Sequence, residues 1–186
     1  MHQEKHSIIV SVIIPHHNNK QILVDCLDSL YQSTYKNFEI IVVDNASFDD
    51  SINDVRSNYP NITIIQSLKN LGYAGGCNLG AMDAKGEYLF FLNNDTTLDK
   101  NCIQKLVNKL ESDSKIVSVQ PKILNLKDKS SFDYAGASGG FIDYLVFPFT
   151  RGRIFNRIEK DTGQYDDSVK IFWASGAGFL TRKNIF

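Results

Sequence analysis

The sequence predicts an α/β protein with a mostly parallel, doubly wound sheet and helices on both of its faces. Two observations predict this class. Short runs rich in β-branched residues alternate with stretches whose apolar residues recur at helical spacing. The runs are apolar throughout rather than at every second position, which is typical of strands buried on both faces. The length of 186 residues suggests a single domain, 1–186.

Five strands are expected, and the first is the run SIIVSVIIP, which a proline closes. In order, the expected strands cover residues 7–15, 38–44, 61–67, 87–93 and 115–121. Beyond them, 133–153 is aromatic and glycine-rich without a clear period, and 156–168 is polar and expected to be a mobile loop. The segment 169–186 returns to strand-like character.

Four helices are expected between these strands. They cover about 20–33, 47–57, a stretch from the glycine-rich turn 70–80 to near residue 86, and 99–111. Asn18 or Asn19 can cap the first helix and Ser47 the second, because their side-chain oxygens accept backbone N–H groups. Gly86 is expected to end the third helix.

Composition and charge exclude some classes of protein. With 42% hydrophobic and 22% charged residues the chain is typical of a soluble globular protein, and its net charge of −1 argues against a nucleic-acid binder that works through bulk charge. Cys26, Cys77 and Cys102 form no Cys-x-x-Cys pair and are expected to be free thiols in a reducing compartment. Without a recognisable signal peptide, a cytoplasmic location is expected.

Small polar residues follow each of the first four strands. Pro15-His16-His17-Asn18, Asp44-Asn45-Ala46-Ser47, Asn70-Leu71-Gly72 and Asn93-Asn94-Asp95 stand at these strand ends. Ligands of open α/β sheets bind at the carboxyl ends of the strands. The sequence therefore predicts a ligand site at this rim.

Two common phosphate-binding sequences are missing. No G-x-x-x-x-G-K-[ST] occurs, and no G-x-G-x-x-G follows the first strand. The glycine cluster NLGYAGGCNLG, 70–80, follows the third strand instead, and the helix start after it could offer N–H groups to an anion. A purely structural role for these glycines, in a tight turn and close helix packing, is the alternative.

Asp95 is the candidate metal ligand. Mg²⁺ and similar ions are often held by one or two carboxylates together with phosphate oxygens and water, so one protein carboxylate beside a diphosphate suffices. Asn93 and Asn94 would add hydrogen bonds for a ribose or sugar without adding negative charge. The alternative is an Asx turn that reverses the chain and caps the next helix.

Five segments occur together in order: SVIIPHHN, EIIVVDNASFDDS, NLGYAGGCNLG, YLFFLNNDT and WASGAGFLTRK. This ordered set resembles the family 2 inverting glycosyltransferases with the GT-A (Rossmann-like) fold, and most of all their rhamnosyltransferase-like branch. The resemblance covers about 7–186. It implies a nucleotide-sugar-binding half at 7–121 and the start of an acceptor-side half at 122–186.

The resemblance also implies roles for individual residues. The implied donor-binding residues are Pro15, His17, Asn18, Asp44, Asn45, Asn70, Gly72, Gly75, Gly76, Asn78, Asn93, Asn94 and Asp95. Among them Asp95 is the metal ligand for Mn²⁺ or Mg²⁺, and Asp44 recognises the base or ribose. Trp173, Ser175 and Gly176 would close the site on the acceptor side.

The sequence departs from the family pattern at three places. His17 replaces the usual tyrosine, Asn93 replaces the first aspartate of the metal motif, and no Glu-Asp pair is present to supply the usual catalytic base. The base is therefore expected beyond Phe186, in a chain truncated at its C-terminus that binds donor but turns over poorly.

The implied reaction moves a sugar, with rhamnose the first choice, from a dTDP- or UDP-linked donor to a glycan or lipid-linked acceptor in cell-surface polysaccharide synthesis. Two alternatives are a sugar nucleotidyltransferase and a non-catalytic nucleotide-sugar-binding module. The basic residues Arg151, Arg153, Arg157 and Lys160 could meet a lipid-linked acceptor or the inner face of a membrane, although such clusters are more often solvated loops. An oligomer is compatible with the sequence.

Overall fold

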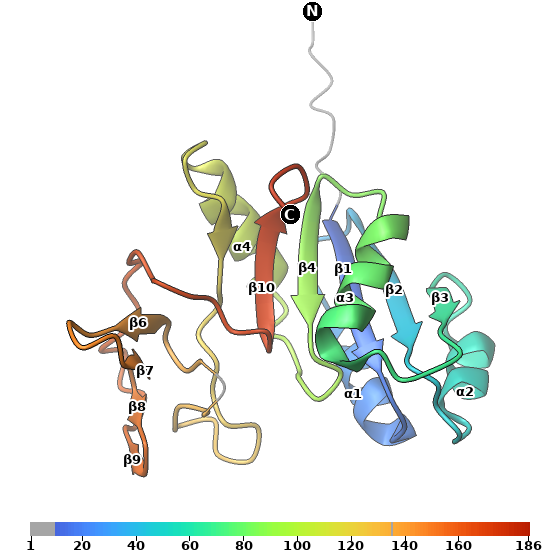
Figure 1. Cartoon of the computed structure of the whole chain (residues 1–186), viewed down its shortest axis with the longest axis horizontal. Coiled ribbons are helices and arrows are strands. Elements are labelled where there is room, and N and C mark those ends of the chain that lie inside the picture. Colours follow the sequence, from blue (N-terminus) through green and yellow to red (C-terminus); the bar gives the residue numbers. More distant parts are fainter. Residues whose placement is uncertain (1–9, 135) are drawn as a thin grey trace, which may run out of the picture.

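The computed structural model describes residues 10–134 and 136–186. A six-stranded sheet with the order β3-β2-β1-β4-β10-β5 forms the centre, and a four-stranded sheet, β6-β7-β8-β9, lies beside it (Figure 1). All pairings among β3, β2, β1 and β4 are parallel, whereas β10 runs antiparallel to both of its neighbours. The expected α/β class with a mostly parallel sheet is confirmed.

The strands of the central sheet are β1 (Val10–His16), β2 (Phe38–Asp44), β3 (Thr63–Gln66), β4 (Tyr88–Leu92), β5 (Ser118–Val119) and β10 (Gly178–Arg182). The helices are α1 (Lys20–Tyr31), α2 (Ser51–Asn58), α3 (Gly72–Asp83) and α4 (Cys102–Glu111). The first four strands and the four helices thus lie where the sequence predicts them, except that residues 7–9 of the first expected strand lie outside the described residues.

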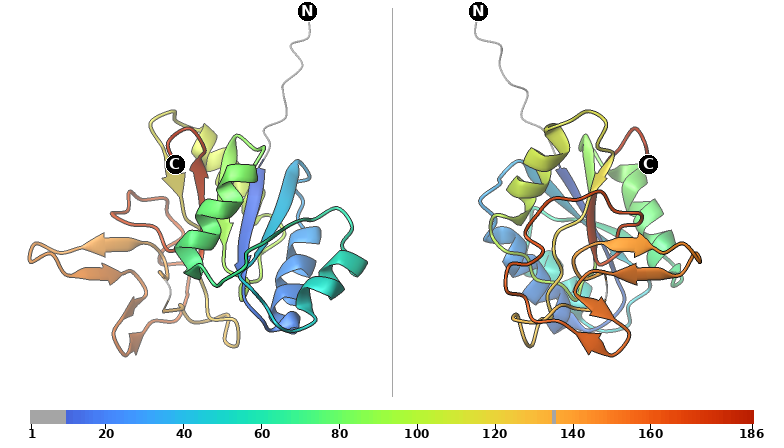
Figure 2. Two further views of the ribbon diagram at one scale, coloured as in Figure 1. Left: turned by 45° about the vertical axis from the view of Figure 1, so that its right-hand side comes forward. Right: turned by 90° about the vertical axis from the view of Figure 1, so that its left-hand side faces the viewer.

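Helices cover both faces of the sheet. Val10, Val12 and Ile14 of β1 point to one face and share a core with apolar residues of α1, α2 and α4. Ile13 points to the other face, where it packs with Cys77 of α3. The right-hand view of Figure 2 shows α3 on one side of the sheet and α1 and α4 on the other. All residues of β1 are buried, as expected for a strand covered on both faces.

The expected turn at the glycine cluster is wrong, because the cluster forms helix α3 itself. Gly76 and Gly80, one helical turn apart, lie where the helix meets the sheet. A Cβ on Gly80 would lie 2.5 Å from Cγ2 of Ile13, so the absence of a side chain lets the helix approach β1. The helix ends at Asp83, and Gly86 instead donates its backbone N–H to Oγ of Ser11.

The expected helix caps are also wrong. Neither Asn18 nor Asn19 makes a side-chain hydrogen bond to the start of α1; Asn18 binds the backbone N–H of Phe48 instead. Ser47 lies before the first turn of α2, and its Oγ accepts the backbone N–H of Asn18. These polar side chains therefore join the two loops that follow β1 and β2, where the ligand site is expected.

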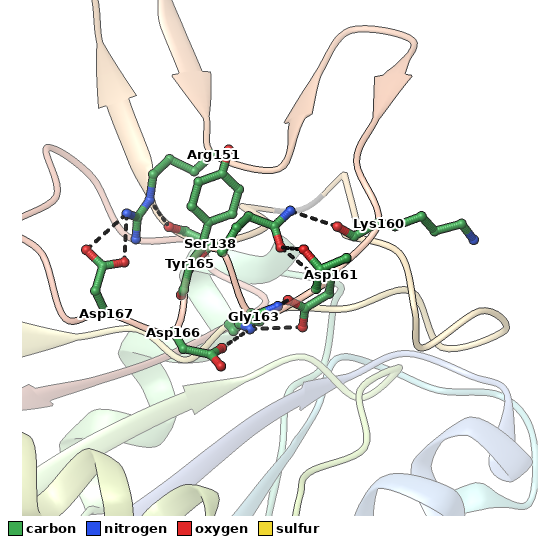
Figure 3. A network of polar contacts seen from close by, with 11 residues as sticks. Ser138, Arg151, Lys160, Asp161, Gly163, Tyr165, Asp166 and Asp167 are labelled. Carbon is green, nitrogen blue, oxygen red and sulfur yellow. Dashed lines mark hydrogen bonds and ion pairs between the residues drawn. The ribbon is translucent and has the colours of Figure 1, made fainter.

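The segment 156–168 was expected to be a mobile loop, but polar contacts fix it against the rest of the chain. Arg151 reaches Asp167 at 3.1 Å and the backbone oxygen of Ser138 (Figure 3). Lys122 Nζ lies 2.9 Å from Asp161 and also contacts Asp166.

The same contacts bear on the basic cluster that the sequence contains near this segment. Arg151 is paired with Asp167, and Lys160 lies 2.7 Å from Asp128. Since two of its four members are neutralised, the cluster does not form a patch of unopposed positive charge. Within residues 10–134 and 136–186, none of the helices combines the length and apolar character needed to cross a membrane.

The second sheet is small and consists of two hairpins. Its strands are β6 (Gly140–Ile142), β7 (Pro148–Thr150), β8 (Arg153–Ile154) and β9 (Arg157–Ile158). The tips of the hairpins carry exposed apolar side chains, among them Tyr144, Val146 and Phe155.

Candidate functional site

A cleft of about 260 Å³ lies at the carboxyl ends of β1, β2 and β4, at the rim where the sequence predicts a ligand site. It is lined by Pro15, His16, His17, Asn45, Asn70, Gly72, Tyr73 and Asn94. Six of these residues are on the sequence-derived list of donor-binding residues, and His16 and Tyr73 are not. Residues from four segments far apart in the chain thus meet in one place.

A wider hollow of about 540 Å³ lies at the opposite end of the sheet, beside Glu87 and Arg182. The guanidinium of Arg182 already donates to backbone oxygens of Ile116 and Leu110 and contacts Glu111. Because its main polar group is engaged in structural contacts, this hollow is the weaker candidate for a ligand site.

His17 stands at the mouth of the cleft. Its Nδ1 lies 2.9 Å from the backbone oxygen of Asn45, which can only accept, so Nδ1 carries a proton. Its Nε2 lies 3.1 Å from Nδ2 of Asn18. The ring meets Phe48 edge-on with centroids 6.1 Å apart, and Phe48 is 86% exposed. This pair offers aromatic surface to a planar ligand, and Phe48 was not among the residues expected at the site.

Strand β2 ends at Asp44 and Asn45 follows it, and of the two only Asn45 lines the cleft. The buried carboxylate of Asp44 accepts hydrogen bonds from the backbone N–H of Ser47 at 2.8 Å and from Nε2 of Gln66 at 3.2 Å. Asn45 donates through Nδ2 to the backbone oxygen of Gly72, while its buried Oδ1 has no partner within the described part of the chain. Asn45 therefore holds an unused acceptor beside the cleft.

The start of α3 forms one wall of the cleft. Oδ1 of Asn70 accepts the backbone N–H of Gly72 at 2.8 Å, and Gly72 has a φ of +69°, which favours glycine. The other expected members of this segment, Gly75, Gly76 and Asn78, lie within the helix and do not line the cleft. A Cβ on Gly76 would lie 2.9 Å from both Pro15 and Asn45, so this glycine lets α3 pack on the strand ends.

Of the three residues that follow β4, only Asn94 lines the cleft. Its Nδ2 lies 2.8 Å from Nδ1 of His16. Asn93 is partly buried and Asp95 is exposed at the surface next to the cleft. The alternative role as a cap for the next helix finds no support, because α4 begins only at Cys102.

The three expected acceptor-side residues make contacts in different parts of the structure. The hydroxyl of Tyr73, a cleft residue, donates to the backbone oxygen of Gly176, so Gly176 lies beside the cleft. Ser175 donates its backbone N–H to Oε1 of Gln120. Trp173 packs against Gly140 of the second sheet and donates from Nε1 to the backbone oxygen of Phe141. Trp173 thus joins the second sheet to the segment that passes the cleft.

Burial controls the protonation of two groups near the cleft. Burial lowers the pKa of His16, although the carboxylates of Asp49 and Asp44 act in the opposite direction. Burial raises the pKa of the Cys77 thiol to about 11, so this thiol stays protonated near neutral pH. A nucleophilic role for Cys77 is not favoured.

The residues at the rim fit a divalent cation only if a ligand supplies further oxygens. Among the residues that the structure describes, no three His, Cys, Asp or Glu side chains lie close enough to form a metal site by themselves. Asp95 provides one accessible carboxylate. One carboxylate with phosphate oxygens and water is a common way to hold Mg²⁺, so the donor set suits a cation that arrives with a diphosphate.

Sequence comparison places nearly the whole chain in one family. Residues 11–186 match Glycosyl transferase family 2. Glycosyltransferase GlyG of Streptococcus pneumoniae serotype 4 is 33% identical over 143 residues, which are 75% of this chain and 44% of GlyG. Poly(ribitol-phosphate) beta-glucosyltransferase of Bacillus spizizenii is 32% identical over 105 residues, or 53% of this chain and 17% of that protein. The chain spans between 24% and 57% of the length of four curated relatives from Haemophilus, Streptococcus and Rickettsia.

Solved structures share the fold. Mannosyltransferase PcManGT from Pyrobaculum calidifontis, in complex with GDP-Man and Mn²⁺, has a TM-score of 0.60 at 24% identity. The superposition covers 67% of this chain and 38% of the PcManGT chain. S. aureus TarS 1-349 in complex with UDP has a TM-score of 0.57 at 24% identity, with 62% of this chain and 36% of the TarS 1-349 chain covered. These likenesses confirm the expected GT-A fold, and the family match over 11–186 shows that the chain belongs to glycosyl transferase family 2.

Proposed function

We propose that this chain is the donor-binding part of a glycosyltransferase that moves a sugar from a nucleoside diphosphate to an acceptor hydroxyl with inversion. The observation that carries the proposal is the cleft at the strand ends, where Pro15, His17, Asn45 and Asn94 meet the start of α3. The first N–H groups of a helix have no partner within the helix and suit a phosphate. The family match supports the reaction class.

The nucleotide we propose is UDP or dTDP, with dTDP-rhamnose the first choice among sugars. The support is the segment Asp44-Asn45-Ala46-Ser47, through which the sequence resembles the rhamnosyltransferase-like branch. Uracil and thymine carry an N3–H donor, and the acceptor we propose for it is the carboxylate of Asp44 at the end of β2. Among the structural neighbours, one was solved with UDP and another with GDP-Man, so the neighbours alone do not select a base.

The acceptor we propose is a glycan or lipid-linked hydroxyl compound in cell-surface polysaccharide synthesis. A relative named for glucosyl transfer to poly(ribitol-phosphate) supports this class. The residues next to the cleft that could face an acceptor lie in the segment of Gly176, which Tyr73 fixes to the start of α3.

In the proposed reaction the acceptor oxygen attacks the anomeric carbon while the bond to the diphosphate breaks, and a general base takes the proton of the acceptor. Asn94 and Asn45 would orient the donor through hydrogen bonds, and Asp95 would hold a divalent cation. When bound, that cation would stabilise the negative charge that develops on the leaving diphosphate. Asp and Glu are absent from the lining of the cleft, so a carboxylate that acts as the base would come from outside it.

A thermal-shift screen tests this proposal. Nucleoside diphosphates and nucleotide sugars are added with and without Mn²⁺, since a ligand that binds only the folded state raises the melting temperature according to its affinity. We expect UDP or dTDP to stabilise the protein more than GDP and ADP, and Mn²⁺ to increase the effect. Preferential stabilisation by GDP would remove the pyrimidine assignment, and no response to any nucleotide would remove the proposed function.

The role of Asp95 is tested in the same assay. Asp95→Ala should weaken binding of the preferred nucleotide in the presence of Mn²⁺ by roughly 10-fold or more, with no effect on the unliganded melting temperature. The matched control is Asp83→Ala, which removes an exposed carboxylate at the far end of α3. If Asp95→Ala binds nucleotide and Mn²⁺ as the parent protein does, Asp95 is not the metal ligand.

A further inference from the structure

A chain of polar side chains runs from helix α2 to the cleft. Oγ of Ser51 donates to Oδ1 of Asp49 at 2.5 Å, and Nε2 of His16 lies 2.9 Å from the same Oγ. On the other side of the ring, Nδ1 of His16 lies 2.8 Å from Nδ2 of Asn94. His16 and Ser51 are almost completely buried, with 1% and 0% of their surface exposed.

The chemistry of the groups fixes the direction of each hydrogen bond. A carboxylate only accepts, so the single hydroxyl proton of Ser51 points to Asp49. Oγ of Ser51 can then only accept from the ring, which requires a proton on Nε2 of His16. In the neutral ring Nδ1 is the acceptor, and it must receive its hydrogen bond from the NH₂ group of Asn94.

We propose that His16 is a positioning residue, which fixes the side-chain amide of Asn94 with its NH₂ group toward the ring and leaves Oδ1 to accept a hydrogen bond from a ligand in the cleft. Without His16 the amide could turn by 180° at little cost, because its oxygen and nitrogen have nearly the same shape. The cleft would then present a donor as readily as an acceptor.

The consequence is a preference for ligands that offer a hydrogen-bond donor at this point. A hydroxyl group of a ribose or of the transferred sugar is such a donor, whereas a phosphate oxygen or a carboxylate is not. This assignment of the ligand group rests on the proposed function. The orientation of the amide does not, since it follows from contacts within the protein.

The orientation is tested by NMR on the ligand-free protein. Long-range ¹H–¹⁵N correlation spectra of the histidine rings distinguish the two neutral tautomers. We expect His16 to be neutral near pH 7.5 with its proton on Nε2, and a proton on Nδ1 would overturn the proposal. Ser51→Ala should raise the fraction of the Nδ1–H form, and an unchanged tautomer would also overturn it. Ser57→Ala is the matched control, because Ser57 is an exposed residue of the same helix whose Oγ donates to the backbone oxygen of Asn53.

The effect on binding is tested by a double-mutant cycle with the nucleotide or nucleotide sugar that binds the parent protein best. His16→Ala and Asn94→Ala should each weaken binding by roughly 3- to 10-fold, as expected for one hydrogen bond. Because His16 acts through Asn94, the double variant should bind no more weakly than Asn94→Ala alone. The proposal would be overturned if the double variant lost affinity by the product of the two single losses. It would also be overturned if His16→Ala bound with the affinity of the parent protein.

The two parts of the test separate two kinds of failure. If the parent protein binds no nucleotide, the proposed function fails, and the NMR measurement still decides the orientation of Asn94. If the nucleotide binds but the tautomer is the opposite one, the positioning role fails alone. His16→Ala removes a buried side chain, so circular dichroism must first show that the variant is folded; if it is not, the tautomer measurement on the parent and on Ser51→Ala decides.

Discussion

At the scale of single residues, His16 is a buried side chain of the site with a polar contact at each ring nitrogen. It is 1% exposed and bonds polar groups from α2 and from the end of β4. The titratable groups that face it are the carboxylates of Asp49 and Asp44 and the ring of His17. Burial outweighs the two carboxylates and lowers its pKa, so the folded protein favours the neutral ring.

The lowered pKa of His16 predicts how stability depends on pH. The unfolded chain takes up the proton near the ordinary value of 6.5, whereas the folded protein resists protonation until a lower pH. The contribution of His16 is therefore complete above about 6.5 and is lost as the pH falls through the folded pKa. Urea unfolding between pH 7.5 and 5 should show a steeper loss for the parent protein than for His16→Gln. Parallel pH profiles for the two proteins would contradict this prediction.

The sequence predicted much of the rim but not its internal contacts. Asn45 and Asn94 were placed at the rim because polar residues follow apolar runs, a pattern that is local in sequence. His16 and Tyr73 were not selected as donor-binding residues, because their partners lie far away in the chain: Asn94 for His16, and the backbone of Gly176 for Tyr73. The available signal for His16 was its place directly after the first apolar run, which marked it as a rim residue but did not indicate a contact with Asn94.

At the scale of elements, α3 shows where local propensity fails. Glycine is a poor helix former, so the cluster 70–80 favoured a turn in the sequence analysis. Packing on the sheet decides otherwise, because Gly76 and Gly80 let the helix come close to Pro15 and Ile13. Strand 38–44, with the β-branched run Ile40–Val43 at its centre, was predicted with its observed bounds.

Close packing of α3 predicts the cost of adding a single methyl group. In Gly80→Ala the new Cβ would lie 2.5 Å from Cγ2 of Ile13 and 3.0 Å from Cγ2 of Val43, both in the buried sheet. We expect a loss of about 1–3 kcal/mol in the free energy of unfolding, despite the better helix propensity of alanine. Denaturant unfolding measures it. Met82→Ala, an exposed position of the same helix, should change stability by less than about 0.5 kcal/mol. Equal stabilities of the two variants would show that α3 moves away from the sheet freely.

At the scale of the whole molecule, the two sheets differ in how much apolar surface they bury. Both buried clusters lie on the central sheet and its helices. In the hairpins of the second sheet, side chains such as Tyr144, Phe147 and Phe155 are more than half exposed. Ion pairs near the surface, such as Arg151 with Asp167 and Lys122 with Asp161, help to hold this region in place. The sequence did not predict these contacts, since long-range ion pairs leave no periodic pattern.

This contrast predicts the order of hydrogen exchange. Backbone N–H groups of β6 to β9 should exchange through local opening, well before those of β1, β2 and β4, whose exchange requires unfolding of the core. Lys122→Ala should accelerate exchange in 158–168 further and leave β1 unchanged, because the ion pairs with Asp161 and Asp166 would be lost. Exchange mass spectrometry measures both. Equal protection of the two sheets would mean that they open as one cooperative unit.

The position of β10 has a consequence for how the chain folds. β10 separates β4 from β5, and Gly178 at its start pairs with Leu92. The strands β1, β2, β3 and β4 follow one another closely in sequence, so they can pair early, whereas closing the long connection to β10 costs more chain entropy and is slower. During synthesis on the ribosome, the edge of β4 therefore stays open until residues near Arg182 have emerged. Through that interval the unpaired edge of β4 can pair with a strand of another chain. Pairing of β10 with β4 therefore competes kinetically with intermolecular association.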